Sequence, residues 1–183
     1  MVIGIGGISR SGKTTLSLQL AQLFGQNVVV LHQDEFVAAR HTQPRIRHGL
    51  EDRTDWEAPG SLDFRAFITA VIQARLTHSV IIAEGLMVFW EPKLYRLFDA
   101  GIFLSIRKET FIERKNRDLR WGRVPDWYRE HIWNSHQKYG QVPPTFRPIL
   151  HLSGELPIEI TPVMRFLMEV VVGEKNEKAP TIC

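Results

Sequence analysis

The chain has little of what marks secreted and membrane proteins. Its 183 residues include a single cysteine, Cys183 at the last position, so an intrachain disulfide framework is excluded and a reducing compartment is the default expectation. No apolar run approaches the length of a membrane span, and no secretory signal is recognisable. We therefore expect a cytoplasmic protein, with an additional nuclear location left open, and no membrane partner.

A strong excess of one charge is also missing. The sequence has 23 Lys and Arg against 20 Asp and Glu, which leaves a net charge of only +3. Nothing repeats internally and no segment is of low complexity. Because 44% of the residues are hydrophobic and the length suits about one domain, we expect a single domain over residues 1–172 and a flexible tail over residues 173–183.

A glycine-rich loop near the start carries the clearest chemical signal. Residues Gly7–Thr14 fit G-x-x-x-x-G-K-[ST], after an apolar stretch typical of a buried strand and before leucines at helical spacing. In this arrangement backbone N–H groups and the helix N-terminus bind phosphate, Lys13 reaches the β- and γ-phosphates, and the Thr14 hydroxyl holds Mg²⁺. A glycine-rich turn that binds nothing is the alternative. The predicted nucleotide contacts are Gly7, Ser9, Arg10, Ser11, Gly12, Lys13, Thr14 and Thr15.

Strands and helices are expected to alternate along the chain. Apolar runs predict strands over 2–5, 28–31, 79–83, 101–106 and 149–152. Helical periodicity predicts helices after residue 14 and over 62–76, 93–98, 109–119, 126–139 and 161–171, the last with Thr161 as N-cap and Pro162 at its first position. The alternation predicts an α/β fold of the P-loop NTPase type, with a doubly wound, parallel five-stranded sheet and helices on both faces.

Two carboxylates follow predicted strands at the ligand side of such a sheet. Asp34 comes after the second strand, and Glu84 ends the third. An acid at these places contacts Mg²⁺ directly or through water in P-loop enzymes, so the predicted metal ligands are Thr14, Asp34 and Glu84. A solvated loop acid is the alternative for Asp34. Residues 37–61 show no apolar period, and we interpret residues 34–61 as an acceptor-binding loop.

Basic residues gather between residues 107 and 129, with Arg114 and Arg117 on one face of a predicted helix. A solvated charged helix and a nucleic-acid surface are two possible interpretations. Beside a phosphate-binding loop, a mobile Arg-bearing lid over about 109–140 is the better one, because phosphoryl transfer needs cations over the migrating phosphate. We expect an anionic small molecule here, no nucleic acid, and a monomer or weak homo-oligomer.

Several motifs in a fixed order give the chain a family resemblance. They are GISRSGKTT, Gln33-Asp34-Glu35-Phe36, Asp55-Trp56-Glu57-Ala58-Pro59 followed by Leu62-Asp63, Ile81-Ile82-Ala83-Glu84-Gly85, and Glu113-Arg114-Lys115-Asn116-Arg117-Asp118. Over roughly residues 1–160 the chain resembles nicotinamide riboside kinases and, more distantly, uridine kinases. The chain departs from many of these relatives at Thr54, where they have tyrosine, and at Glu113, where they often have a second arginine.

The resemblance implies ATP-dependent phosphorylation of a ribose 5′-hydroxyl, with Mg²⁺. It implies Lys13 and Asp34 as catalytic residues, with Asp34 as general base, and Asp55 with Arg114 on the ribose hydroxyls. Arg117 is implied in the lid over ATP, and Gly154 near the adenine. The implied acceptor contacts are Asp34, Glu35, Phe36, Asp55, Trp56 and Arg114.

The expected acceptor is a small-molecule nucleoside, nicotinamide riboside. Its pyridinium charge suits an aromatic face near carboxylates, which Trp56 beside Asp55 offers. Alternatively Trp56 only packs the loop, and an aromatic of the 127–139 helix serves. A uridine or cytidine kinase shares nearly all the motifs. A GTP-binding switch lacks support because no N-K-x-D segment occurs, and the intact Lys13 argues against a silent nucleotide-binding module.

Overall fold

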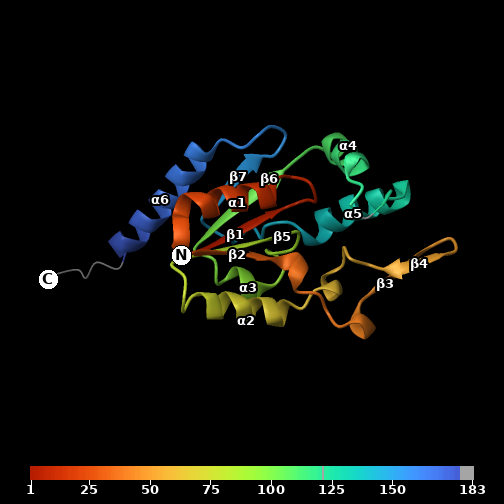
Figure 1. Cartoon of the computed structure of the whole chain (residues 1–183), viewed down its shortest axis with the longest axis horizontal. Helices are drawn as coiled ribbons and strands as arrows, with labels where there is room; N and C mark the ends of the chain where they lie inside the picture. The colour runs from red at the N-terminus through yellow and green to blue at the C-terminus, as the bar shows by residue number, and fades with distance from the viewer. Residues whose placement is uncertain (121, 178–183) are drawn as a thin grey trace.

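The computed structural model describes residues 1–120 and 122–177. Its centre is a sheet of five parallel strands in the order β2-β5-β1-β6-β7 (Figure 1). The strands are β1 (Val2–Gly7), β2 (Val28–His32), β5 (Val80–Gly85), β6 (Ala100–Ser105) and β7 (Ile149–Ser153). Every predicted strand is present, and the predicted α/β class is confirmed.

Helices cover both faces of this sheet. The helices are α1 (Lys13–Phe24), α2 (Phe64–Ala74), α3 (Pro92–Tyr95), α4 (Lys108–Arg117), α5 (Asp126–Tyr139) and α6 (Ile160–Glu177). Figure 1 shows α1 and α6 on one face and α2 and α3 on the other. Helices α4 and α5 pack on the P-loop end through a third apolar cluster, which contains Ile8, Phe111 and Ile132. Short 3-10 turns occupy Gly25–Asn27, Gln33–Glu35, Arg40–Thr42 and Pro59–Ser61.

Strand β1 shows how the sequence fixes the two layers. Ile3 and Ile5 are fully buried on the α1 and α6 face. On the other face, a Cβ added at Gly4 would lie 2.2 Å from the Phe98 ring. Gly6 is equally crowded by Phe89. The glycines of β1 therefore let the rings of the opposite layer approach the central strand, and this packing anchors the strand that leads into the P-loop.

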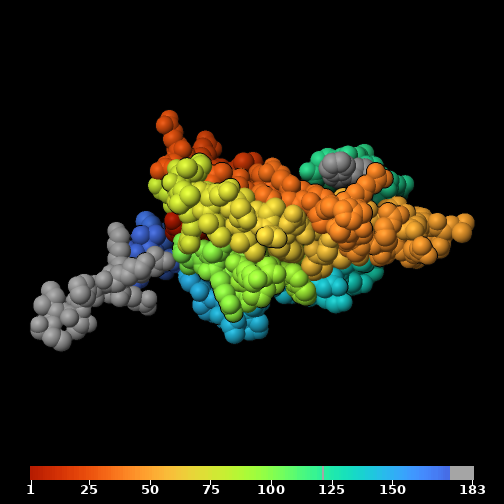
Figure 2. All heavy atoms as spheres, turned by 90° about the horizontal axis from the view of Figure 1, so that it is seen from below, coloured from red at the N-terminus to blue at the C-terminus, as the bar shows by residue number. Residues whose placement is uncertain are grey.

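A β-hairpin stands inside the expected acceptor loop. Strands β3 (Arg45–His48) and β4 (Glu51–Thr54) pair antiparallel around a turn at Gly49, which has a φ of +58°. Figure 2 shows this arm projecting from the body. No strand was among those predicted over residues 37–61, so the hairpin adds two strands to the predicted set. Both hairpin faces are largely exposed, so the strands carry charged residues and lack the apolar alternation that signals a half-buried strand.

The last helix also differs from its prediction. Helix α6 begins at Ile160, so Thr161 and Pro162 lie in its first turn and Thr161 is not the N-cap. The helix continues to Glu177, so residues 173–177 of the expected tail are helical, and their flexibility stays a prediction; residues 178–183, including Cys183, lie outside the described residues. Among the helices of residues 1–120 and 122–177, none combines the length and apolarity that crossing a membrane requires.

Candidate functional site

The loop between β1 and α1 has the backbone form of a phosphate cradle. Gly7 and Gly12 have φ values of +144° and +103°, and Arg10, with φ +68°, occupies the left-handed region that few non-glycine residues adopt. The Ser11 hydroxyl is buried without a hydrogen-bond partner among the described residues. A buried donor left unpaired in this loop fits a phosphate oxygen, because such a group is costly unless a ligand pairs it.

Lys13 is held inside this loop. Its side chain is only 8% exposed, and its Nζ donates to the Ile8 carbonyl over 3.1 Å. Burial lowers the pKa of Lys13, while the charges of Glu84 and then Asp34 oppose that shift. The lysine is thus fixed in direction and surrounded by acids across the site.

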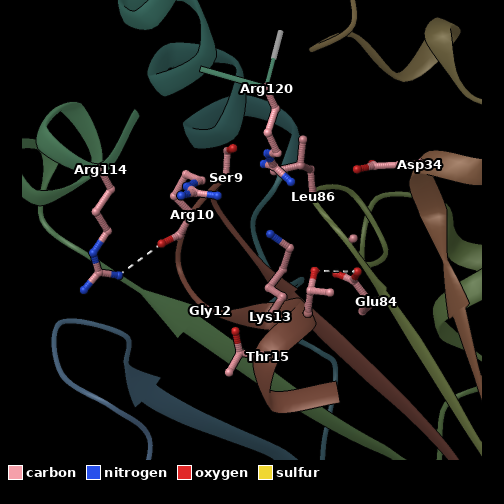
Figure 3. Close-up of a pocket in the computed structure, with 12 residues that line it drawn as sticks. Ser9, Arg10, Gly12, Lys13, Thr15, Asp34, Glu84, Leu86, Arg114 and Arg120 are labelled. Carbon is pink, nitrogen blue, oxygen red and sulfur yellow. Dashed lines mark hydrogen bonds between the residues drawn. The ribbon is translucent and has the colours of Figure 1, made fainter. Parts of the chain in front are cut away.

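A pocket of about 530 Å³ opens above the loop (Figure 3). It brings together nine of the residues predicted from sequence and adds Gly85, Leu86 and Arg120. Its lining is Ser9, Arg10, Gly12, Lys13, Thr14, Thr15, Asp34, Glu84, Gly85, Leu86, Arg114 and Arg120. The phosphate loop and the two strand-end carboxylates therefore face one cavity, as the parallel sheet predicts.

Asp34 owes its position to its neighbour Gln33. Gln33 is 1% exposed, and its Oε1 accepts the Met87 N–H over 2.8 Å. A Cβ on Gly85 would lie 2.3 Å from the Gln33 Cβ, so only glycine fits at that place. Gln33 thereby ties the end of β2 to the segment after β5 and leaves the exposed Asp34 side chain in the pocket. Gln33 belongs to the motif over residues 33–36 of the sequence, but no role was predicted for it.

Glu84 lies at the floor of the pocket, 6% exposed. Its Oε1 accepts the Thr14 hydroxyl over 2.9 Å and lies 2.7 Å from the His32 Nδ1. A hydroxyl and carboxylates on one cavity wall are ligands that Mg²⁺ takes alongside water and phosphate oxygens. Within the described residues no group of three His, Cys, Asp or Glu forms a metal cluster of its own. The residues fit Mg²⁺ that is shared with a phosphate ligand.

Arg114 lies on the nucleotide-loop side. Its guanidinium donates to the carbonyls of Arg10 over 3.0 Å and Glu155 over 2.8 Å. Gly154 packs on the same loop, since an added Cβ would lie 2.3 Å from the Ser11 carbonyl oxygen. A second pocket of about 300 Å³ lies there, lined by Ser11, Gly12, Thr15, Leu16, Gln19, Arg114, Gly154, Glu155, Leu156, Pro157 and Ile158. Arg114 and Asp55 share no described contact, so the structure does not bring this implied ribose pair together.

Arg120, which the sequence analysis did not select, reaches the pocket in place of Arg117. Arg117 pairs with Glu113 one helical turn away, its side chain is 75% exposed, and it is not among the pocket-lining residues. Arg120 lies in the segment after α4 and points into the cavity (Figure 3). The implied assignment of the lid cation to Arg117 therefore fits this structure less well than Arg120.

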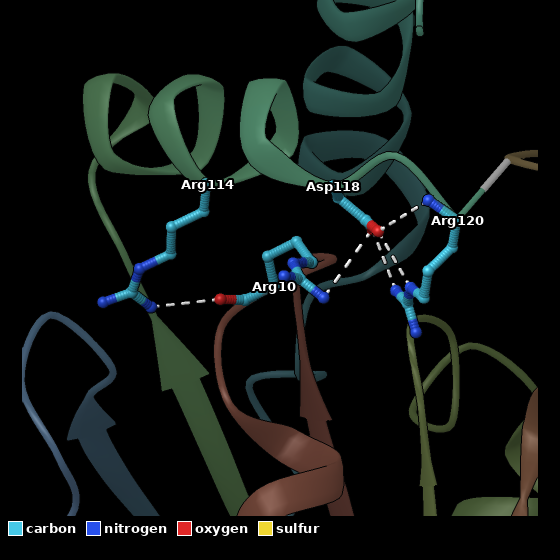
Figure 4. A network of polar contacts seen from close by, with 4 residues as sticks. All are labelled: Arg10, Arg114, Asp118 and Arg120. Carbon is cyan, nitrogen blue, oxygen red and sulfur yellow. Dashed lines mark hydrogen bonds and ion pairs between the residues drawn. The ribbon is translucent and has the colours of Figure 1, made fainter. Parts of the chain in front are cut away.

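Asp118 holds that arginine in place (Figure 4). Its buried carboxylate accepts the Arg120 Nε over 2.8 Å and the Arg120 Nη2 over 2.9 Å, and the Arg10 guanidinium lies 3.7 Å away. The hydrogen bonds from Arg120 hold the pKa of Asp118 well below its usual range. The carboxylate links the lid segment to the P-loop arginine.

Asp55 and Glu57 form the acidic wall of the expected acceptor loop. An Asp55 carboxylate oxygen lies 2.7 Å from the His131 Nε2 of α5 and accepts the Glu57 N–H over 3.1 Å. Burial raises the pKa of Glu57 to about 7; Lys115 opposes this shift, and the charges of Asp55 and Asp34 add to it. Glu57 and His131 were not predicted site residues. In the sequence, Glu57 was visible only as an acidic residue close to Asp55, and His131 only as a polar residue in a helix rich in aromatic residues.

The other three residues implied as acceptor contacts differ in how far they are exposed. Trp56 is 48% exposed, so part of its ring is open to a ligand. Phe36 stacks on Phe67 with ring centroids 4.6 Å apart and belongs to the apolar layer of α2. Glu35 is exposed beside Asp34. Trp56 therefore remains a candidate contact, while Phe36 has a packing role.

No family model matches the chain. It is 27% identical to human nicotinamide riboside kinase 2, over 77% of this chain and 68% of the relative, and 29% identical to the mouse protein, over 76% and 79%. It is 29% identical to a uridine kinase of Chlamydia pneumoniae, over 65% of this chain and 64% of the relative.

Solved structures share the fold of this chain. A sugar kinase from Janibacter sp. HTCC2649 covers 93% of each chain with a TM-score of 0.58 at 19% identity. This likeness shows the fold alone. The sequence relatives confirm the expected resemblance to the nicotinamide riboside kinases and uridine kinases, and the solved structure confirms the expected class of fold.

Proposed function

We propose that this chain, a P-loop phosphotransferase with a hydroxyl acceptor, transfers the γ-phosphate of ATP to the ribose 5′-hydroxyl of nicotinamide riboside. The product is nicotinamide mononucleotide, which places the reaction in NAD salvage. The observation that carries the proposal is the pocket in which Lys13, Asp34 and Arg120 face one another across the phosphate loop. A donor phosphate on the loop and an acceptor hydroxyl at Asp34 then meet in one cavity.

The residues divide the work of phosphoryl transfer. Such a transition state is loose, so the protein contributes alignment and neutralisation of charge more than covalent chemistry. Lys13 and Arg120 bring positive charge to the phosphates from opposite sides. Asp34 orients the acceptor hydroxyl and takes its proton. Thr14 and Glu84 would hold Mg²⁺, which when bound neutralises phosphate charge.

Nucleoside recognition is assigned to the loop that precedes α2. Asp55 and Glu57 present carboxylates that accept hydrogen bonds from sugar hydroxyls, and His131 fixes the first of them. The exposed Trp56 offers a π face to a cationic base, and a cation over an indole is worth about 0.5–2 kcal/mol. The similarity to human and mouse nicotinamide riboside kinase 2 supports nicotinamide riboside as the acceptor.

A uridine or cytidine kinase is the second candidate, because a uridine kinase matches at the same level of identity as the mouse nicotinamide riboside kinase. An acceptor scan separates the two. ADP release is measured at constant ATP while nicotinamide riboside, uridine, cytidine and adenosine are offered singly. We expect the highest kcat/KM for nicotinamide riboside, and a higher value for uridine would overturn the acceptor assignment.

Trp56→Ala extends the same scan. It should lower kcat/KM for nicotinamide riboside and leave uridine nearly unchanged, because only the first base carries a positive charge. Equal losses on both acceptors would make Trp56 a scaffold residue. Slow ATP hydrolysis that is independent of every acceptor would instead indicate a nucleotide switch.

A further inference from the structure

Tyr128, in the first turn of α5, carries a buried hydroxyl without a hydrogen-bond partner in the described part of the chain. The residue is 7% exposed and packs in the apolar cluster with Ile8 and Phe111. The Trp56 backbone lies beside its oxygen without the geometry of a hydrogen bond. A buried donor without a partner destabilises the free protein. A bound ligand that accepts this hydrogen bond would remove that cost.

The surroundings of this hydroxyl are the acidic wall of the acceptor loop. Burial, and then the negative charges of Glu57 and Asp55, raise the pKa of Tyr128, so the phenol stays protonated and remains a donor. The charge of Asp34 acts on Glu57 in turn, which joins this wall to the phosphate pocket. The Tyr128 ring lies 5.6 Å from the His131 ring, whose Nε2 contacts the Asp55 carboxylate, so the tyrosine packs beside the acidic wall proposed to bind the acceptor.

The ring is fixed from the hairpin side. The Arg53 guanidinium of β4 lies 5.3 Å from the Tyr128 ring centroid, and the Trp127 ring meets it edge-on at 5.3 Å. A ring held in this way cannot turn its hydroxyl to bulk water. The structure thus holds one donor hydroxyl on the helix whose His131 contacts the Asp55 carboxylate.

We propose that Tyr128 donates its hydrogen bond to a sugar hydroxyl of the acceptor and thereby helps select polyhydroxylated acceptors. A sugar hydroxyl is both donor and acceptor. Its O–H can donate to the Asp55 carboxylate, but its lone pairs then need a donor, which a carboxylate cannot give. Tyr128 supplies that donor. This inference rests on the proposed use of a nucleoside acceptor at this site.

The test is Tyr128→Phe, which removes one oxygen and keeps the ring. The KM of the acceptor should rise about three- to tenfold, as expected for one neutral hydrogen bond, while kcat and the KM of ATP stay within about twofold. The melting temperature should stay the same or rise, because the hydroxyl has no partner to lose. Tyr95→Phe is the matched control: Tyr95 lies on α3 against Phe146, and its substitution should leave all kinetic constants unchanged.

A second measurement uses acceptors that lack one sugar hydroxyl each. If Tyr128 contacts a given hydroxyl, wild type loses affinity when that hydroxyl is removed, and Tyr128→Phe loses much less. An unchanged acceptor KM in Tyr128→Phe, or additive losses for every deoxy acceptor, would overturn the inference. The assay is run on whichever hydroxyl acceptor the wild type uses, so a wild type that ignores ribosides refutes the proposed function while the KM comparison still decides the role of Tyr128.

Discussion

Glu57 makes a quantitative prediction about stability and pH. Its pKa is about 7 in the folded protein, against about 4.5 in the unfolded chain. The folded state therefore binds the Glu57 proton more tightly than the unfolded state does. Between pH 4.5 and pH 7 the stability contributed by this group falls as the pH rises, and above pH 7 the full loss is reached.

The size of the effect follows from the two pKa values. At about 1.4 kcal/mol for each tenfold change in proton affinity, the loss is about 3 kcal/mol, a large part of a typical folding free energy. Glu57→Gln removes the titration and keeps the shape of the protonated acid. At pH 4.5 the variant and the wild type should be equally stable, and at pH 7.5 the variant should be about 3 kcal/mol more stable.

A second buried group, His136, has the opposite pH dependence. The stability of each variant must therefore be compared with that of the wild type at each pH, because the wild-type profile alone combines both effects. Burial lowers the pKa of His136 to about 4 from 6.5, so its contribution to stability is complete above pH 6.5 and is lost as the pH falls toward 4. This slope opposes that of Glu57, and the two nearly cancel in the wild type between pH 4.5 and 6.5. His136→Gln should therefore gain stability over the wild type only at low pH, whereas Glu57→Gln gains it only at high pH.

Urea unfolding of the substrate-free protein at pH 4.5, 5.5, 6.5 and 7.5 measures these differences. The m-values of wild type and variants should agree, so that changes in midpoint report stability alone. A free-energy difference between Glu57→Gln and wild type that stays constant to within about 0.5 kcal/mol across the four pH values would refute the reasoning. It would mean that the carboxyl is as hydrated in the fold as in the unfolded chain.

Two further predictions concern catalysis. Asp34→Asn should lower kcat by about 100-fold or more with little change in the KM of ATP, since general-base contributions run to about 10²–10⁴; steady-state kinetics check this, and collapse of ATP binding with normal kcat would make Asp34 a metal or structural residue. Arg120→Ala should lower kcat by about tenfold or more, whereas Arg117→Ala, which removes an exposed side chain paired with Glu113, should stay within about twofold. The reverse order in the same assay would return the lid role to Arg117.

The sequence predicts the parts of the site that depend on local geometry. The P-loop positions follow from glycines at fixed offsets beside Lys13, and the strand-end places of Asp34 and Glu84 follow because parallel strands end at one edge of the sheet. These predictions need only the order of elements. No knowledge of side-chain partners far along the chain is required.

Other parts depend on contacts that no local pattern records. The pairing of His131 with Asp55 joins residues 76 positions apart. Arg117 and Arg120 are both basic residues near the end of α4, and only the turn at Asp118 decides which one enters the pocket. The β3–β4 hairpin was missed because the stacking of His48 on Trp127, with centroids 4.6 Å apart, replaces a buried apolar face.

The central place of β1 has a consequence for how the protein forms during synthesis. β1 is the first strand made, yet its neighbours in the sheet are β5, which ends at Gly85, and β6, which ends at Ser105. The P-loop sequence therefore leaves the ribosome long before the strands that flank it, and it waits for about a hundred residues with its apolar strand unpaired. At about 5–20 residues per second this interval lasts several seconds or more. Nucleotide binding is thus expected only late in translation, and a nascent chain arrested before β6 should not retain ATP.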